Sequence, residues 1–471
     1  MLQRALAALL IAGLCPLPGV PASARATTLT VDVTTDTYDG SCSDGDCSLR
    51  DAVASAADTD TVALPSGFYP LTAVEAGGGA SDGPVEIVTP MTIRGVGETG
   101  AFIDASALGS TPFIVRSDVE IRDVTVFGAE VAGRAGVAEV GGPAVSILRL
   151  RHVTITGGMG TLAGALFVGS SGAVSIRGSL FLSNRSIAGS GAIRLGRGGL
   201  WANVANSSFL ENRGQNGGAM SGGPFTLRSV TLSRNIATAG GGAIKGYFGE
   251  WSQLTITGNR AHRGGAISIT DPEGRPSVGH TVIAGNVSAR GGQCDGRSKS
   301  LGWNVESRTG CGFTATTDQR GVDPGLRPVT SNGGPTPTAS IPPGSVALDV
   351  GGSCSFRDQR GAPRDGPCDA GAYERILCRG RAVDIVGTPG DDDLSGGREP
   401  DTFLGLGGDD EFQGSLDRDR ACGGAGDDHL IGGPAEDVLV GGAGNDVLDG
   451  EGGLDRCRGG PGRDRRVDCE G

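Results

Sequence analysis

The chain has 471 residues, of which 86 are glycine and 11 are cysteine, and its formal net charge is −13 at pH 7. This length allows two or more domains, and glycine without a three-residue period excludes collagen. Residues 387–467 contain 19 acidic residues and eight arginines, so nearly all of the excess acidity lies in this tract. The rest of the chain is close to neutral and shows no basic stripe, which argues against a nucleic-acid partner.

Residues 1–26 have the features of a cleavable export signal. Arg4 supplies a positive charge, residues 5–14 form an apolar run, and small residues at 22–26 offer a cleavage site. The run is too short to span a membrane, and no later segment is apolar enough, so we expect no membrane span. The signal predicts that the mature protein is secreted to the extracellular space.

Residues 48–57 form the one segment with helical periodicity, because Leu49, Val53, Ala56 and Ala57 share a face. We expect this helix to belong to an N-terminal cap at about 42–60. Such a cap covers the first coil of a stacked β-structure, where strand edges would otherwise be exposed.

Residues 90–290 carry a looser repeat of roughly 23–29 residues. Short runs with alternating β-branched residues end at an asparagine, and a Gly-Ala step follows. The alternation predicts strands, and the period is that of a β-solenoid. Asparagine tolerates left-handed turns, and its amide can bond to an amide one coil above. A structural ladder is therefore the preferred interpretation of Asn184, Asn212, Asn235, Asn259 and Asn286.

Segments at both ends of this repeat resemble known families. Residues 47–52 read Cys-Ser-Leu-Arg-Asp-Ala, similar to the Cys-Ser-Leu-Arg-Glu-Ala signature of many secreted bacterial right-handed β-helices, with Asp51 replacing glutamate. Residues 332–338, 358–361 and 368–374 resemble the closing region of the choice-of-anchor Q β-helix proteins. The resemblance covers about residues 42–374 and implies a right-handed parallel β-helix, which we assign to a domain at 27–374 with a closing region at about 321–374. It also implies a C-terminal module for attachment or release.

After a linker or first strand at 375–386, nine consecutive nonapeptides fill 387–467. Each has aspartate at its sixth position, and most have a large apolar residue at the eighth. Glycines at positions one, two and four permit positive-φ turns that aim carbonyls at one point, and the carboxylate adds a hard oxygen suited to Ca²⁺. The tract resembles the hemolysin-type calcium-binding (RTX) repeats, which implies a calcium-binding parallel β-roll over 387–471. Strict register argues against the alternative, an acidic disordered tail.

Two nonapeptides make one coil, so alternate aspartates stack on one edge of the roll, 18 residues apart. We call the loops of repeats one, three, five, seven and nine the odd edge, and those of the other four the even edge. The even edge carries Glu399, Asp417 and Ala435 at position four, where a side chain hinders the turn, and Arg418 competes with a cation. We therefore expect roughly three to four strong sites on the odd edge. Their expected ligands are Asp391, Asp392, Asp409, Asp410, Asp427, Asp428, Asn445, Asp446 and Asp464.

Removal of the signal leaves ten cysteines, an even number that suits an oxidising compartment. Most are close neighbours in sequence and suggest four short-range disulfides: Cys42 with Cys47, Cys294 with Cys311, Cys354 with Cys368, and Cys457 with Cys469. Cys378 and Cys422 remain as a fifth pair, and joining them is expected to require a distorted first coil of the roll. Connectivity stays open at this point. Metal ligation by cysteine is the alternative, but no CxxC pair supports it.

No catalytic residue is predicted. Residues 90–290 contain no paired aspartates, and His152, His262 and His280 fall at different places in the repeat. The densest aromatic group offers a ligand patch, although core or turn packing is the preferred interpretation: Tyr247, Phe248 and Trp251. We interpret the chain as a secreted calcium-binding β-solenoid with a non-catalytic cell-surface, matrix or adhesion role. Its expected partners are calcium and extracellular polysaccharide or cell-surface material. The alternative is a carbohydrate-active enzyme, either a polysaccharide lyase or a glycoside hydrolase.

Overall fold

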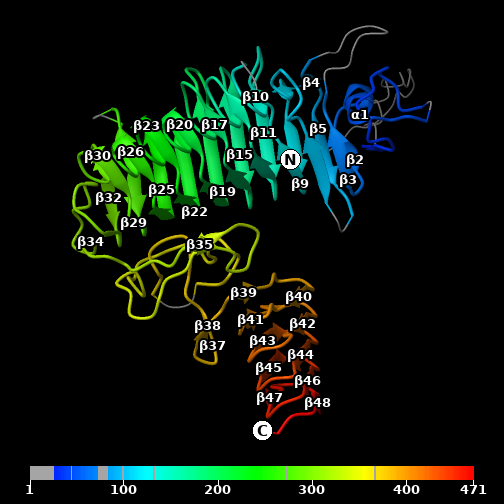
Figure 1. The fold of residues 1–471 in the computed structure, drawn as a ribbon, viewed down its shortest axis with the longest axis vertical. Helices are drawn as coiled ribbons and strands as arrows, with labels where there is room; N and C mark the ends of the chain where they lie inside the picture. The colour runs from blue at the N-terminus through cyan, green and yellow to red at the C-terminus, as the bar shows by residue number, and fades with distance from the viewer. Residues whose placement is uncertain are drawn as a thin grey trace, which may run out of the picture.

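The structure, a computed structural model, describes residues 26–43, 45–72, 83–97, 100–130, 133–271, 274–364 and 367–470. Its described part contains one helix, α1 (Leu49–Ser55), and otherwise strands, turns and loops. The strands build two stacks of parallel coils, drawn from blue to green and from orange to red in Figure 1. The predicted fold class, an all-β chain with a parallel β-helix followed by a parallel β-roll, is confirmed. Residues 1–25 of the expected signal peptide lie outside the described residues.

Three parallel sheets form the β-helix. The large sheet contains β1 (Thr28–Thr30), β2 (Asp60–Leu64), β3 (Gly67–Pro70), β5 (Met91–Gly95), β6 (Ala101–Asp104), β8 (Val119–Arg122), β9 (Val124–Phe127), β11 (Ser146–Arg151), β12 (Thr154–Thr156), β15 (Gly172–Arg177), β16 (Leu180–Leu182), β19 (Trp201–Leu210), β22 (Phe225–Ser233), β25 (Gly249–Thr257), β28 (Ser277–Gly279), β29 (Val282–Ala284), β32 (Lys299–Gly302), β33 (Val305–Glu306) and β34 (Gln319–Arg320). The second sheet contains β4 (Val85–Ile87), β7 (Phe113–Val115), β10 (Ala138–Val140), β14 (Leu166–Val168), β18 (Ile193–Leu195), β21 (Met220–Gly222), β24 (Ile244–Gly246), β27 (Ile267–Ile269) and β31 (Cys294–Asp295). The third contains β13 (Met159–Gly160), β17 (Arg185–Ser186), β20 (Arg213–Asn216), β23 (Ile236–Gly240), β26 (Arg260–Arg263) and β30 (Val287–Arg290).

The roll is built from two further parallel sheets. One contains β39 (Ile385–Val386), β41 (Thr402–Leu404), β43 (Arg420–Ala425), β45 (Val438–Ala443) and β47 (Arg456–Arg458). The other contains β40 (Asp393–Ser395), β42 (Glu411–Gln413), β44 (His429–Gly433), β46 (Val447–Glu451) and β48 (Arg465–Val467). Two antiparallel pairs lie between the solenoids in the chain: β35 (Val329–Thr330) with β36 (Thr338–Ala339), and β37 (Leu377–Cys378) with β38 (Arg381–Ala382).

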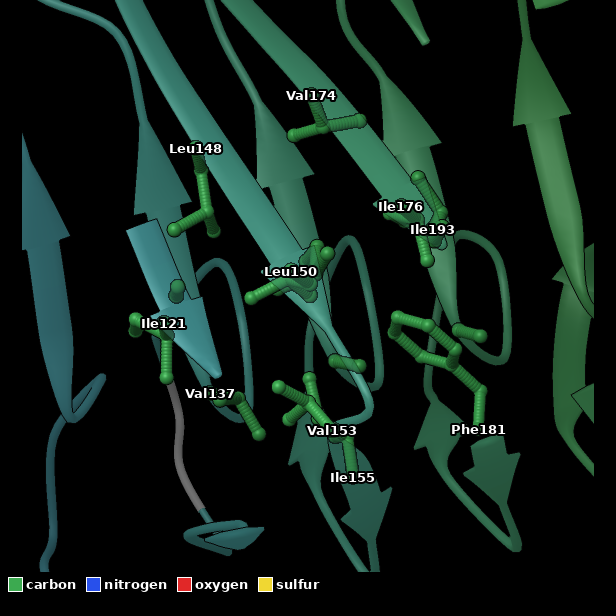
Figure 2. Close-up of a cluster of buried hydrophobic side chains, with 14 of the residues drawn as sticks. Ile121, Val137, Leu148, Leu150, Val153, Ile155, Val174, Ile176, Phe181 and Ile193 are labelled. Carbon is green, nitrogen blue, oxygen red and sulfur yellow. The ribbon is translucent and has the colours of Figure 1, made fainter. Parts of the chain in front are cut away.

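A core of apolar side chains fills the β-helix. Ile121, Leu150 and Ile176 are register partners on three successive coils, and each is buried. Figure 2 shows them among the neighbouring side chains of the interior. Burial of each such side chain contributes roughly 1.5–3 kcal/mol, so the regular inward alternation of apolar residues is what holds successive coils together.

The predicted asparagine ladder is confirmed. Nδ2 of Asn184 donates to Oδ1 of Asn212 at 3.0 Å, and the same contact links the next three pairs at 2.9–3.0 Å. Each amide also reaches a backbone carbonyl, as Nδ2 of Asn212 does at Phe181 O. These side chains are buried, so their hydrogen-bonding groups are used by the ladder and leave no free group for catalysis.

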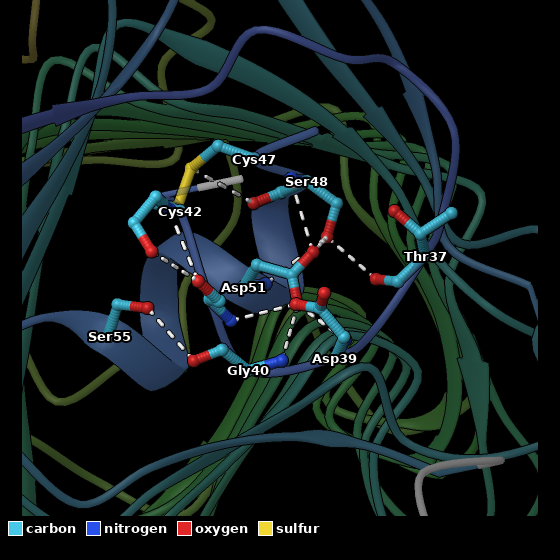
Figure 3. The surroundings of a disulfide bond; sticks show 10 residues. Thr37, Asp39, Gly40, Cys42, Cys47, Ser48, Asp51 and Ser55 are labelled. Carbon is cyan, nitrogen blue, oxygen red and sulfur yellow. Dashed lines mark hydrogen bonds between the residues drawn. A yellow bond between two sulfur atoms is a disulfide. The ribbon is translucent and has the colours of Figure 1, made fainter. Parts of the chain in front are cut away.

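The predicted N-terminal helix is present as α1, and its residues Leu49, Ala52 and Val53 are buried in the core of the β-helix. Ser48 accepts from the backbone N–H of Asp51 at 3.1 Å, and Asp51 Oδ2 accepts from the N–H of Ser48 at 3.3 Å. These reciprocal bonds form a capping box, beside the Cys42–Cys47 disulfide (Figure 3). Asp51 Oδ1 also accepts from the N–H groups of Asp39 and Gly40, so the aspartate ties the preceding loop to the helix.

Eight successive coils of the large sheet, from β8–β9 to β32–β33, each bend at one residue in the left-handed backbone region, with φ between 50° and 58°: Asp123, His152, Gly178, Asn206, Ser229, Gln253, His280 and Trp303. The bend divides the coil into two arms. The first arm ends before the bend, and the second begins after it. Segment 331–374 covers part of the second arm, because Ser208 Oγ donates to Pro337 O and Thr255 Oγ1 accepts from the N–H of Ala372.

The closing segment is held by buried polar contacts. Gln359 donates to Ser208 Oγ at 2.7 Å and accepts from Thr231 Oγ1 at 2.7 Å. The guanidinium of Arg360 pairs with Asp358 at 2.9 Å and lies 3.9 Å from the ring centre of Tyr373. The motif that resembles a family closing region thus fixes the closing segment to the large sheet of the β-helix through buried hydrogen bonds.

The structure pairs the ten cysteines of the described residues into five disulfides. Four join the close neighbours in sequence named above, and the fifth joins the remaining pair, Cys378 and Cys422. The expectation that Cys378–Cys422 requires a distorted first coil is wrong. The roll keeps its 18-residue register at this point, since Phe403 pairs with Ala421. Cys378 lies outside the coils, in the β37–β38 hairpin, and meets Cys422 from the outer face with a Cα–Cα distance of 6.0 Å.

Within the described residues, no helix is long and apolar enough to cross a membrane.

Candidate metal centre

The roll places one aspartate of each repeat in a loop between its two sheets. The apolar eighth positions form the thin core, and those of the second to seventh repeats are fully buried: Phe403, Phe412, Ala421, Leu430, Leu439 and Leu448. Successive coils pair with an 18-residue shift, as in Leu430 with Leu448. The sixth-position aspartates therefore recur at the same place in every coil, on the odd edge and on the even edge.

The aspartates form a ladder on each edge. On the odd edge, the backbone N–H of Asp410 donates to Oδ1 of Asp428 at 3.0 Å, and the N–H of Asp428 donates to Oδ1 of Asp446 at 3.0 Å. On the even edge the corresponding distances are 2.7–2.8 Å. The last even rung ends on Glu470, whose Oε2 accepts from the N–H of Asp455 at 2.5 Å.

The second carboxylate oxygen has no hydrogen-bond partner in six of these residues: Asp410, Asp419, Asp428, Asp437, Asp446 and Asp455. Each residue is at most 2% exposed. Burial raises the pKa of Asp410 and Asp419 to about 7 and that of Asp428 and Asp437 to about 6. A stack of buried oxygens without donors destabilises the roll unless protons or cations neutralise it, and Ca²⁺ is a hard cation that prefers carboxylate and carbonyl oxygens.

The first-position glycines make room for these carboxylates. A Cβ at Gly414, Gly432 or Gly450 would lie 2.5 Å from Oδ2 of the aspartate in the same loop. None of the nine first-position glycines has a positive φ, so the expectation that they serve positive-φ turns is wrong. Their lack of a side chain matters instead, because the carboxylate occupies the space that a Cβ would fill.

The two edges differ at positions four and five. On the odd edge Gly408, Gly426, Gly444 and Gly462 have φ between 104° and 155°, whereas Gly453 is the one fourth-position residue of the even edge in this region. The odd edge also has a second ladder, in which the N–H of Asp409 donates to Asp391 and that of Asp427 to Asp409, both at 2.8 Å. The even edge instead carries the exposed Arg418–Glu436 ion pair at 2.8 Å.

These contacts place the predicted calcium ligands in one continuous strip. Asp391, Asp409, Asp427 and Asn445 form its outer row, and Asp392, Asp410, Asp428, Asp446 and Asp464 form its inner row. Within the described residues, no three His, Cys, Asp or Glu side chains gather as a ready metal-binding group. A cation bound here would therefore complete its shell with backbone carbonyls of the loops.

The structure also reveals carboxylates that the sequence analysis left out of the site. Asp419, Asp437 and Asp455 on the even edge are buried and have the same unpartnered Oδ2 as their odd-edge counterparts. The sequence does carry a signal for these three residues, because each occupies the sixth position of its repeat. Glu470 lies beyond the last repeat and carries no such signal, yet it ends the even ladder.

The proposed aromatic patch is not formed as a three-ring platform. Trp251 is 1% exposed, and its Nε1 donates to Phe225 O at 3.2 Å, so it belongs to the core. Tyr247 and Phe248 pack edge to face with ring centres 5.4 Å apart, and Phe248 remains exposed. Core packing, the preferred interpretation, is thus confirmed for Trp251, because strand β25 directs its side chain inward, and the alternative of a ligand patch that includes Trp251 is wrong.

The histidines lie in different settings. His152 occupies a bend of the large sheet and is exposed, as expected for a turn residue, and its Nδ1 lies 3.3 Å from Asp123 Oδ1. His280 is buried beside Trp303, with ring centres 5.0 Å apart. His262 is exposed on β26.

Comparison with known proteins identifies the repeat tract. The family model for the RTX calcium-binding nonapeptide repeat matches residues 386–421, 414–438 and 431–465. RTX repeats bind calcium, and the tract is a set of such repeats. No curated protein matches the chain.

Two solved structures align over most of the chain at low similarity. A PL6 alginate lyase in complex with a trisaccharide is 11% identical with a TM-score of 0.22, and the alignment covers 93% of this chain and 61% of the lyase. The PL6 family alginate lyase AlyGC is 13% identical with a TM-score of 0.22, covering 88% and 74%. The chain thus spans about three fifths of the length of the first. These scores are too low to support any inference on function.

Proposed function

We propose that this protein is a secreted calcium-binding β-solenoid, in which Ca²⁺ assembles the roll and the β-helix has a non-catalytic cell-surface, matrix or adhesion role. The stacked buried carboxylates carry the proposal, because six of them have an oxygen without a hydrogen-bond donor. The tract holds 19 acidic residues, which repel one another when no cation is bound. Its thin core is then insufficient to offset the loss of chain entropy on folding.

Each proposed domain has its own role. Residues 1–26 direct export, 27–374 form the β-helix, and 387–471 form the roll that attaches or presents it. Five disulfides among the described residues suit an oxidising extracellular compartment, where calcium is also available. The resemblance to choice-of-anchor Q proteins supports the same arrangement, since that family joins a β-helix to varied C-terminal modules.

The odd edge is proposed as the main calcium edge. Its outer and inner rows supply the oxygens named above, and left-handed glycines shape its loops. Arg463 lies next to Asp464, so the gap that reaches Asp464 is expected to be the weakest. Magnesium is expected to substitute poorly, because it demands tighter octahedral geometry.

Limited proteolysis of the full chain tests calcium-dependent assembly. Trypsin can cut an unfolded tract at Arg398, Arg418 and Arg420. We expect these sites to be protected in millimolar calcium and cut in chelator, while the β-helix stays intact in both. Magnesium at the same concentration is the matched control and should protect poorly. An identical digestion pattern with and without calcium contradicts the proposal.

Cleavage of a polysaccharide is the second candidate function. One observation favours it: His152 and Asp123 form a pair at the bend of the large sheet, beside the charged side chains of Arg122 and Arg151. An assay for unsaturated or reducing sugar ends on uronate and neutral glycans distinguishes the two functions. If the native chain releases such ends and the His152→Ala variant does not, the protein is an enzyme and the proposal of a non-catalytic role is wrong.

A further inference from the structure

Five arginines lie in one line on the first arm of the large sheet. Strand register aligns Arg94 with Arg122, Arg122 with Arg151, and Arg151 with Arg177. Ala205 occupies the next coil, and Arg228 follows on the coil after it. Strands β5, β11, β15, β19 and β22 follow one another along the β-helix in Figure 1, and β8 pairs with both β5 and β11. Neighbouring strands are about 4.8 Å apart, so the row places one cation at nearly every strand spacing.

The row is only partly neutralised by the protein. Arg151 Nε lies 3.6 Å from Glu120, and Arg122 Nε lies 3.8 Å from Asp123, both beyond hydrogen-bond length. In the part of the chain that the structure describes, no ion pair includes Arg177 or Arg228, and both are exposed. Like charges on adjacent strands are destabilising. At the end of the row from β11 to β22, the positive charges of the arginines are therefore not balanced by the protein, and an anionic ligand would neutralise them.

A groove of about 460 Å³ lies over this end of the row. Arg149, Arg151, Arg177 and Arg228 line it, with Ala205 in the gap between the long side chains. A second line of register partners runs beside the arginines and is polar but uncharged on three coils: Ser175, Asn203 and Thr226. The closing segment lies next to the bend, where Thr336 Oγ1 donates to Asn206 O at 3.3 Å.

We propose that this groove binds an acidic polysaccharide, with uronate carboxylates on Arg151, Arg177 and Arg228 and sugar hydroxyls on Ser175, Asn203 and Thr226. An extended 1,4-linked uronate chain carries one carboxylate per sugar, and its advance per sugar is comparable with the strand spacing of the coils. Arginine binds carboxylates through a planar fork of N–H donors, and neutral polar side chains suit hydroxyl groups. The inference rests on the matrix role proposed above and names its partner.

The surroundings favour a narrow sugar chain over nucleic acid. Asp118, Glu120 and Asp123 flank one end of the groove, and Glu250 follows Thr226 in register at the other end. These carboxylates would repel a wide polyanion such as duplex DNA. Binding of single strands relies on aromatic side chains that stack with bases, and the lining of this groove contains none.

Calorimetry on the full chain in calcium tests the inference with galacturonate oligomers of four to six sugars. The probe is compared with the carboxyl-reduced oligomers, which keep the hydroxyls and lose the charge. We expect the uronate form alone to bind, and Arg177→Gln/Arg228→Gln to lower its affinity about tenfold or more. The control Arg213→Gln/Arg260→Gln removes two exposed arginines that are also two coils apart, on the third sheet. This control variant loses the same net charge but no arginine of the groove, so we expect its affinity for the uronate oligomers to change less than about twofold.

Each outcome bears on the inference. Equal losses in the two double variants, equal binding of the carboxyl-reduced oligomers, or no binding by the native chain would overturn it. Tighter binding of single-stranded DNA of matched charge, lost in the same variant, would also overturn it. Calcium binding and thermal unfolding are measured on the same samples. Intact calcium binding without uronate binding therefore refutes this inference alone, whereas loss of calcium binding refutes the proposed assembly of the roll.

Discussion

The backbone N–H of Asp428 donates to Oδ1 of Asp446 at 3.0 Å across 18 residues, while Oδ2 of Asp446 is buried without a partner. One carboxylate oxygen therefore joins successive coils of the roll, and the other remains available to a ligand. This division explains how one residue type, repeated every nine positions, can serve both the fold and the metal. It also means that a test of calcium binding must keep the first oxygen while changing the second.

Asparagine meets that requirement, because it retains an acceptor oxygen and loses the charge. We expect Asp428→Asn/Asp446→Asn to weaken high-affinity calcium binding on the order of 10–100-fold, because these residues lie on the edge with left-handed glycines and two ladders. Asp419→Asn/Asp437→Asn is the matched change on the even edge and should have much less effect. Titration calorimetry on the full chain measures both, and equal losses would contradict a preference for the odd edge.

Position one of the repeat offers a steric test. A Cβ at Gly441 would lie 2.7 Å from Cβ of Asp446 and still closer to its carboxylate, so Gly441→Ala should destabilise the calcium-loaded roll by about 1–3 kcal/mol. Gly452→Ala is the control, since its Cβ would meet only Pro434 Cα at an ordinary 3.6 Å. Thermal unfolding in calcium compares the two variants. A Gly441→Ala protein as stable as Gly452→Ala would show that the carboxylate does not need this space.

The closing segment should matter for the β-helix and not for the roll. Gln359→Ala leaves Ser208, Thr231 and Thr336 without their buried partner, at a cost of roughly 1–3 kcal/mol. We expect a lower unfolding temperature for the β-helix with unchanged calcium affinity. Gln215→Ala, an exposed glutamine on β20, is the control. A shift in calcium affinity without a change in unfolding would assign Gln359 a different role.

Local repeats made much of this architecture predictable. The nine-residue register alone predicts the aspartate ladders, and the asparagines predict the ladder from Asn184 to Asn286. Residues 48–57 predict α1 because capping depends on neighbours in sequence. These features share one property, namely that the interacting groups recur at a constant spacing.

Features that depend on the relative position of distant segments were not predictable. The sequence shows no basic stripe, yet the structure assembles one, because its five arginines are spread over 135 residues and lie on five of six successive coils. The position of Cys378 outside the coils follows from a hairpin whose docking no local pattern encodes. Core packing was the preferred interpretation for the aromatic group, but only the register of β25 shows that Trp251 is the ring that turns inward while Phe248 stays exposed.

Acid should partly replace calcium in the roll. In calcium-depleted protein, burial raises the pKa of Asp410 and Asp419 to about 7 and that of Asp428 and Asp437 to about 6. Their pKa in the unfolded chain is about 3.9. The folded roll therefore holds protons more tightly than the unfolded tract. The stability that these protons contribute is fully present below about pH 4 and is lost as pH rises through 6–7. Circular dichroism of the 375–471 fragment in calcium-depleted buffer should thus show more β-structure at pH 5 than at pH 8.

With calcium present the direction should reverse, because protons compete for the same oxygens, and affinity should fall from pH 8 to pH 5. Asparagine at Asp410, Asp419, Asp428 and Asp437 imitates the protonated carboxyl, so the fourfold variant should keep its β-structure at pH 8 without calcium. Asp393→Asn, at an exposed position of β40, is the control and should retain the pH dependence of the native fragment. A calcium-depleted native fragment that is equally folded at pH 5 and pH 8 would show that these buried carboxylates do not control the assembly of the roll.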